Sequence, residues 1–247
     1  SLIPGDLYLA GLARLIGSPG VCFIIIFSGF WIFFISERWK RKLNCNKVFF
    51  VGIVTISFLH LIGGYLIQPD NAGTSSYPIS IWQTNIPTRE KLFQNNQTIT
   101  DQIFVEQNKA LSNSAKLLVA PEGTLKTNFR FKEPSKIDTL IGGFRIEKNS
   151  TRNSLLAFKK GDKLYSNFID KYRLVPLGER IPMVFQKFLN LSSLGGIEPG
   201  NQKRYFEWEN SPPFAAIICY EITDGFKIKN AVQDGSKFIV AIANLDP

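Results

Sequence analysis

Residues 214–225 read FAAIICYEITDG, an apolar run that ends at Cys219 and then turns polar. The run over 214–218 predicts a buried strand. The polar pattern of 224–233 predicts a helix, and the apolar residues 237–241 predict a second strand. This succession favours an α/β fold with a layered core. Cys219 is either a buried thiol at the end of a core strand or a nucleophile, and the remaining sequence has to distinguish the two.

The same alternation of strands and helices is predicted upstream of this stretch. A polar, turn-rich linker over 68–78 precedes it. A helix is predicted over 88–112. The predicted strands cover 79–84, 116–120, 139–146 and a hairpin formed by 153–158 and 163–167.

Residues 19–36 and 48–67 contain no charged side chain. Each is close to the roughly 20 residues that cross a hydrocarbon core as a helix. The alternatives are a pair of buried core helices or a cleaved signal peptide. The length of the second segment argues against both. The loop between them is rich in Lys and Arg, which predicts that it stays in the cytoplasm. We therefore expect a membrane region over 1–68, with a loop in its first 20 residues, and an extracytoplasmic catalytic domain over 69–247.

The composition excludes several kinds of site. The only histidine is His60, and the three cysteines, Cys22, Cys45 and Cys219, lie far apart in the sequence. A zinc site of Cys and His ligands and a Cys-His or Ser-His-Asp triad are therefore not expected. We expect no metal and no cofactor. The net charge of +9 comes from lysines scattered through loops, so we expect no nucleic-acid partner.

Three reactive side chains stand at the ends of apolar runs, where α/β proteins gather functional groups. Glu122 follows LLVAP, Lys171 follows YSNFID and Cys219 follows FAAII. A glutamate can take the proton of a thiol, and a nearby lysine favours the thiolate and then stabilises an oxyanion. The backbone N–H of Tyr220 would be a second oxyanion donor. Each residue alone also has a structural explanation, since buried thiols, strand-end carboxylates and lysines are common.

The segments LLVAPEGTL, DKYRLVPLGERIPM and AIICYEI resemble the three signature regions of the nitrilase or carbon–nitrogen hydrolase superfamily. More narrowly, they resemble the apolipoprotein N-acyltransferase family, as do ISIWQTNIPTREKLF and RNSLLAF. The resemblance extends over roughly 78–243. It implies a nitrilase-like four-layer α-β-β-α sandwich, preceded here by two transmembrane helices. The ending ANLDP departs from the family's Asn-Asp-x-Trp pattern, and we expect a fragment that is incomplete at its C-terminus.

By position, the resemblance makes Glu122 the general base, Lys171 the oxyanion-stabilising lysine and Cys219 the nucleophile. It implies transfer of a fatty acyl chain from a membrane phospholipid to the α-amine of a diacylglyceryl-cysteine on an apolipoprotein, through a cysteine thioester. The enzyme would lie in the bacterial inner membrane with its catalytic domain on the periplasmic side. Four further positions would bind substrate or support the site: Asn153, Glu179, Tyr220 and Glu221.

Two other functions stay open from the sequence. One is a membrane-tethered amidase with the same triad that acts on a small amide. The other is an inactive membrane-anchored scaffold, which the presence of all three triad residues and Glu179 argues against. For an enzyme of either kind, we expect that Cys219→Ala and Lys171→Ala abolish activity without unfolding the domain.

Overall fold

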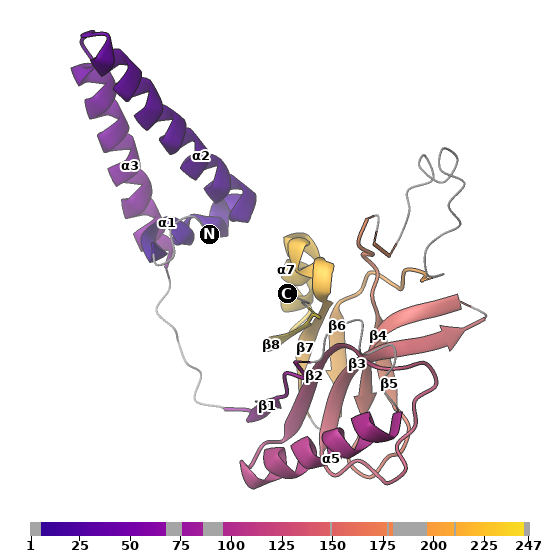
Figure 1. Ribbon diagram of the computed structural model, residues 1–247. Coiled ribbons are helices and arrows are strands. Elements are labelled where there is room, and N and C mark those ends of the chain that lie inside the picture. Colours follow the sequence, from indigo (N-terminus) through magenta and orange to yellow (C-terminus); the bar gives the residue numbers. More distant parts are fainter. Residues whose placement is uncertain are drawn as a thin grey trace, which may run out of the picture. The chain divides into compact units, whose positions relative to one another are not determined.

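The computed structural model describes residues 6–67, 76–85, 96–148, 150–176, 178–179, 197–209 and 211–244. It divides into two compact units, residues 1–74 and 75–247 (Figure 1). Most of the predicted linker over 68–78 lies outside the described residues, as do 245–247 at the divergent C-terminal end.

The first unit consists of α1 (Leu7–Gly11), α2 (Ala13–Lys40) and α3 (Asn46–Leu66). The helices α2 and α3, with 28 and 21 residues, are long and apolar enough to cross a membrane. They cover the predicted spans 19–36 and 48–67, apart from Ile67. The helix α2 is kinked at Gly17, where φ is 66°, two residues before Pro19. The assignment of this unit to the membrane stays a prediction.

The start of the chain differs from the expectation. The loop predicted for the first 20 residues is wrong where the structure describes them, because α1 and the beginning of α2 are helical there. Asp6 caps α1, since its carboxylate accepts a hydrogen bond of 2.9 Å from the backbone N–H of Leu9. The same carboxylate lies 2.9 Å from Nε2 of His60 on α3. The contact with His60 joins residues far apart in the sequence. A five-residue helix is also too short for sequence periodicity to reveal it.

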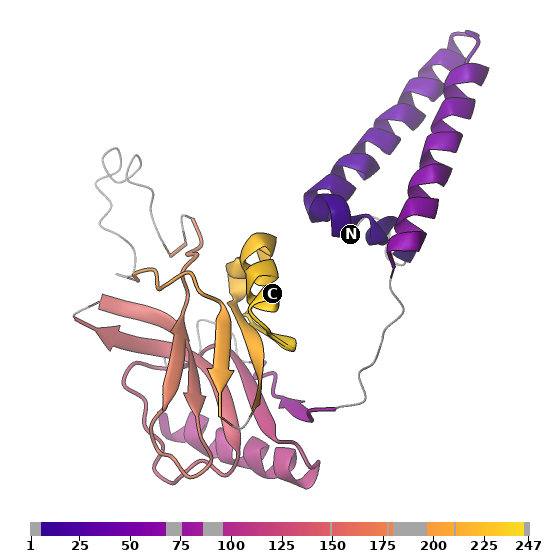
Figure 2. The ribbon, with the colours of Figure 1, turned by 180° about the vertical axis from the view of Figure 1, so that it is seen from behind.

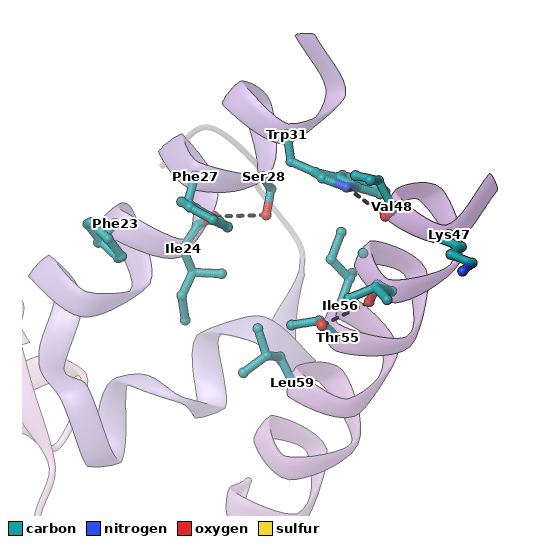
Figure 3. A pocket seen from close by; sticks show the side chains of 12 residues that line it. Phe23, Ile24, Phe27, Ser28, Trp31, Lys47, Val48, Thr55, Ile56 and Leu59 are labelled. Carbon is teal, nitrogen blue, oxygen red and sulfur yellow. Dashed lines mark hydrogen bonds between the residues drawn. The ribbon is translucent and has the colours of Figure 1, made fainter. Parts of the chain in front are cut away.

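An apolar groove of about 430 Å³ runs between α2 and α3 (Figure 3). Trp31 closes part of it and donates a hydrogen bond of 3.2 Å from its indole N–H to the carbonyl of Val48. The hydroxyls of Ser28 and Thr55 donate to carbonyls of their own helices. Because these polar groups are paired within the helix pair, the groove is compatible with a hydrocarbon environment.

The second unit contains two β-sheets (Figure 1). The larger has the order β1-β2-β3-β4-β5, with β1, β2 and β3 parallel and the last two pairings antiparallel. The smaller has the order β6-β7-β8, in which β7 is antiparallel to β6 and parallel to β8. The strands are β1 (Ile79–Ile81), β2 (Leu117–Leu125), β3 (Asp138–Glu147), β4 (Ser150–Phe158), β5 (Asn167–Asp170), β6 (Tyr205–Trp208), β7 (Ser211–Ile218) and β8 (Phe238–Ile242).

The two sheets pack face to face through one apolar core. Its members include Val119 from the larger sheet and Phe214 and Ile218 from the smaller one. On the opposite face of the larger sheet, α5 (Asn96–Ser112) packs through residues such as Ile103. On the smaller sheet, α7 (Gly225–Gln233) contacts β7 (Figures 1 and 2).

The described residues of the second unit therefore form an α-β-β-α sandwich, and the predicted fold class is confirmed. The layering explains why residues 214–218 form an uninterrupted apolar run. Alternate residues of β7 face the other sheet and α7, so its apolar residues 214–218 are buried on both faces.

Several element boundaries differ from the predictions. The strand predicted over 163–167 is wrong, because β5 begins only at its last residue, Asn167. The strand predicted over 139–146 is present as β3, which passes through Gly142 and Gly143 without a break. The predicted helix over 88–112 is present from Asn96, and 88–95 lie outside the described residues. Sequence periodicity also missed β6, a strand of only four residues.

Candidate active site

Glu122 lies within β2, where the pairing with β3 shifts register between Ala120 and Leu125. The strand was predicted to end at Ala120, but it continues through Pro121 and Glu122. The β3 backbone passes very close to this point. A Cβ atom added at Gly142 would lie 2.4 Å from the Cα atom of Glu122. Glycine at this position therefore lets β3 approach and fixes the backbone that carries the Glu122 carboxylate.

We predict that Gly142→Ala lowers the activity of the protein severalfold although it changes no reactive group. The added methyl group displaces backbone atoms of Pro121 and Glu122, both closer than 3 Å to it. The matched control is Gly225→Ala, because no heavy atom lies within 4 Å of that Cβ position. Turnover of the two variants is compared at equal protein. Equal activity in both would contradict this role of the close approach.

Lys171 directly follows β5, and its ammonium group joins two carboxylates. Nζ lies 2.9 Å from Oε1 of Glu122 and 2.9 Å from Oε1 of Glu179. The Lys171 side chain is only 1% exposed. Burial opposes its charge, but the charges of Glu122 and Glu179 and their hydrogen bonds outweigh burial and raise the pKa of Lys171. The lysine is therefore a fixed, charged group.

Asn153, on β4, lies beneath the same carboxylates. Its side-chain amide donates hydrogen bonds of 2.7 Å to Oε1 of Glu122 and 3.2 Å to Oε1 of Glu179. The other oxygen of Glu179 accepts from the backbone N–H of Val175 at 2.8 Å. The second oxygen of Glu122 lies 3.3 Å from the backbone N–H of Asn244. Both oxygens of each carboxylate thus accept hydrogen bonds, and Glu179 helps to hold the Lys171 ammonium in place.

Cys219 is the first residue after β7 and has a backbone φ of 51°. Positive φ is costly for a residue with a Cβ atom, and such strain recurs where a reactive side chain must be presented at a turn. Its thiol hydrogen bonds to the carboxylate of Glu122 and to the backbone N–H of Tyr220. The turn therefore points the sulfur at the carboxylate on the other sheet.

Burial raises the pKa of the Cys219 thiol, and the negative charge of Glu122 raises it further. The charge of Lys171 lowers this pKa, but it does not compensate for the other two effects. The sequence led us to expect a lysine that favours the thiolate. The geometry indicates instead that the resting group is a thiol with a base at hand, so the proton leaves only when attack begins.

The turn after Cys219 is held by a buried carboxylate. Glu221, which is 1% exposed, accepts hydrogen bonds from the backbone N–H groups of Ile218 at 2.9 Å and Tyr172 at 2.6 Å. It also pairs with Arg204 at 3.0 Å. Burial raises the pKa of Glu221, while the charge of Arg204 and the backbone donors oppose that rise. Glu221 therefore supports the fold of the turn from the inside.

The structure brings the predicted site residues together from both sheets. Glu122, Asn153 and Lys171 come from the larger sheet, and Cys219 comes from the smaller one. Tyr220 is half-buried beside Arg173, whose guanidinium lies 5.1 Å from the ring centroid. The reactive roles of these residues stay predictions.

Two parts of this network were not predicted from the sequence. One is Arg204, the partner of Glu221. The other is the hydrogen bond of 2.5 Å from the hydroxyl of Tyr172 to Asp224, which also caps α7. A carboxylate that is buried next to a nucleophile needs a cationic partner. A search of the sequence for a cation to pair with Glu221 could therefore have found Arg204.

The whole chain is similar in sequence to curated proteins named apolipoprotein N-acyltransferase. It is 53% identical over 247 residues to that of Prochlorococcus marinus subsp. pastoris, which covers 100% of this chain and 49% of the relative. It is 25% identical over 244 residues to that of Thermotoga maritima, covering 96% of this chain and 45% of the relative. The resemblance predicted from the motifs is confirmed, and the chain spans about half the length of these relatives.

Two solved structures of nitrilase-superfamily proteins are among those similar to the chain. An amidase from Nesterenkonia AN1 has a TM-score of 0.49 and 14% identity, covering 70% of this chain and 67% of the amidase. A branch 10 member of the superfamily from Saccharomyces cerevisiae has a TM-score of 0.47 and 16% identity, covering 70% of this chain and 68% of that protein. No family model matches the chain.

Proposed function

We propose that this chain carries the reactive centre of a membrane enzyme that acylates the N-terminus of lipoproteins. One observation carries the proposal: the Cys219 thiol at a strained turn meets a carboxylate, Glu122, whose other partner is the buried ammonium of Lys171. This is the arrangement that acyl transfer through a thioester requires. The names of the relatives supply the class of acceptor, which is an apolipoprotein amine.

In the first half-reaction, the acyl donor is a membrane phospholipid. Cys219 sulfur attacks the ester carbonyl while Glu122 takes the thiol proton. The developing oxyanion is stabilised by the charge of Lys171 and by the backbone N–H of Tyr220. The tetrahedral intermediate collapses as Glu122 returns the proton to the leaving alkoxide. Lysophospholipid departs and an acyl-thioester remains on Cys219.

In the second half-reaction, the neutral α-amine of a diacylglyceryl-cysteine attacks the thioester carbonyl. Glu122 takes a proton from the attacking nitrogen, and the same two donors stabilise the oxyanion. Collapse breaks the carbon–sulfur bond and forms the amide, and the proton on Glu122 returns to the sulfur. Both half-reactions use one base and one oxyanion site, so a ping-pong sequence needs no further group.

The two candidate membrane helices support this substrate class. Both substrates are lipids that stay in the bilayer, and an enzyme anchored by α2 and α3 meets them at its surface. By the charge rule for short loops, the basic loop between the helices supports a periplasmic location for the second unit at the inner membrane.

The test uses the full-length gene product in detergent micelles with a phospholipid that carries a labelled acyl chain. A diacylglyceryl-cysteine peptide is the acceptor. We expect labelled N-acyl peptide and lysophospholipid in equal amounts, and no product from Cys219→Ala. An N-acetylated acceptor is the matched control, because it lacks the free amine and is expected to give no product.

A different outcome would favour the amidase. If wild-type protein releases ammonia from a small amide such as butyramide and gives no labelled peptide, the transferase proposal is wrong. If neither reaction occurs while the thiol stays reactive to alkylation, the scaffold hypothesis gains support.

A further inference from the structure

Arg204, in the segment before β6, is buried between the two strand ends that carry the reactive residues. It is 2% exposed. Its Nη1 atom donates hydrogen bonds of 3.0 and 3.2 Å to the two oxygens of Glu221. Glu221 in turn accepts from the backbone N–H of Ile218, the residue before Cys219. One arm of the guanidinium therefore reaches the backbone of the nucleophile turn through a single carboxylate.

The second arm of Arg204 reaches the strand end that carries the lysine. Nη2 donates a hydrogen bond of 3.0 Å to the backbone carbonyl of Asp170, the residue before Lys171, and another to the carbonyl of Asn201. The guanidinium carbon also lies 4.8 Å from the ring centroid of Tyr172, the residue after Lys171. Arg204 thus contacts both neighbours of Lys171 in the chain.

The guanidinium plane makes this double contact possible. It presents two nitrogens in a rigid fork, so that one side chain bonds to two backbone segments at a fixed separation. These segments belong to different sheets, since Lys171 follows β5 and Cys219 follows β7. The core between the sheets is apolar, so its contacts are not directional and do not fix how the two strand ends are aligned.

We propose that Arg204 is a positioning residue, which holds the turn of Cys219 in register with the strand end of Lys171. The proposal rests on the function proposed above where it is tested by acyl transfer. A second measurement, the reactivity of the Cys219 thiol, does not depend on that function. Without Arg204, the turn relaxes and the sulfur loses its alignment with Glu122 and Lys171. Substrate still binds, but the chemical step slows.

The test compares three variants of the full-length gene product. Arg204→Lys keeps the charge but has a single ammonium that cannot span both segments. Arg204→Met combined with Glu221→Met removes both charges, so that no lone buried charge remains to unfold the protein. Ile103→Ala is the matched control, because it opens a cavity against α5 on the far face of the larger sheet.

Two quantities are measured for each variant beside its melting temperature. One is kcat and KM for transfer from a labelled phospholipid to a diacylglyceryl-cysteine peptide. The other is the pH midpoint for alkylation of Cys219 by iodoacetamide, followed by peptide mass spectrometry. We expect both Arg204 variants to lower kcat by about 100-fold with KM little changed, as small misalignments do. Their alkylation midpoint should fall toward the ordinary thiol value of about 8.5, as the burial and the Glu122 contact that raise it are lost.

The control decides between positioning and general stability. Arg204 has no positioning role if two results are found together. For the same drop in melting temperature, the Arg204 variants lose no more activity than Ile103→Ala, and their alkylation midpoint equals that of wild type. If wild type itself transfers no acyl chain, the proposed function fails, yet the alkylation midpoints still decide the role of Arg204.

Discussion

Lys171→Met is expected to lower acyl transfer by at least about 100- to 1,000-fold, the cost of losing one oxyanion donor. It should also destabilise the protein by about 3–5 kcal/mol, because its buried ammonium is the cation paired with both the Glu122 and the Glu179 carboxylates. Without it, the carboxylates of Glu122 and Glu179 both still accept from the Asn153 amide, and no cation offsets the repulsion between them. Turnover and the melting temperature of the full-length gene product measure the two effects.

Lys229→Met is the matched control, since this exposed lysine lies on α7 in the same unit. It should leave both quantities unchanged. The burial of Lys171 revises the expectation from the sequence that its replacement would leave the domain intact. A melting temperature equal to that of wild type in Lys171→Met would contradict the ion-pair cluster described above.

Glu122→Gln is expected to separate thiol reactivity from catalysis. A negative neighbour opposes a second negative charge, so Glu122 raises the pKa of Cys219 and its removal should lower that pKa. Alkylation by iodoacetamide should therefore reach half its maximum at a lower pH than in wild type. Acyl transfer should fall about 100- to 10,000-fold, because the general base is lost.

Glu209→Gln is the control for this variant, since Glu209 is an exposed carboxylate paired with Lys159 on the same unit. It should change neither the alkylation midpoint nor the transfer rate. The alkylation is read at the peptide that contains Cys219, because Cys22 and Cys45 are free thiols as well. An unchanged or higher midpoint in Glu122→Gln would show that the carboxylate does not contact the thiol.

The sequence predicted the parts of this site that depend on local pattern. The apolar run before Cys219 had to be a strand, and a helix had to follow the turn, because both patterns are continuous and cover whole elements. The choice of Glu122 and Lys171 as partners came from a family resemblance, since a carboxylate at a strand end and one lysine among many are individually uninformative.

The sequence did not predict features that arise from contacts between distant segments. The partnership of Arg204 with Glu221 joins residues on two elements, and no spacing rule connects them. The continuation of β2 through Pro121 depends on the close approach of Gly142, which is a property of the neighbouring strand. The raised pKa of Cys219 depends on burial, which only the packed sheets create.

We propose Cys219 as the nucleophile that carries the acyl chain. The most direct measurement incubates the full-length gene product with phospholipid in the absence of an acceptor and analyses its peptides by mass spectrometry. We expect a fatty acyl group on the peptide of Cys219 that hydroxylamine removes, and none on the Cys219→Ala protein. An acyl group on another residue, or transfer to an added acceptor by Cys219→Ala, would contradict it.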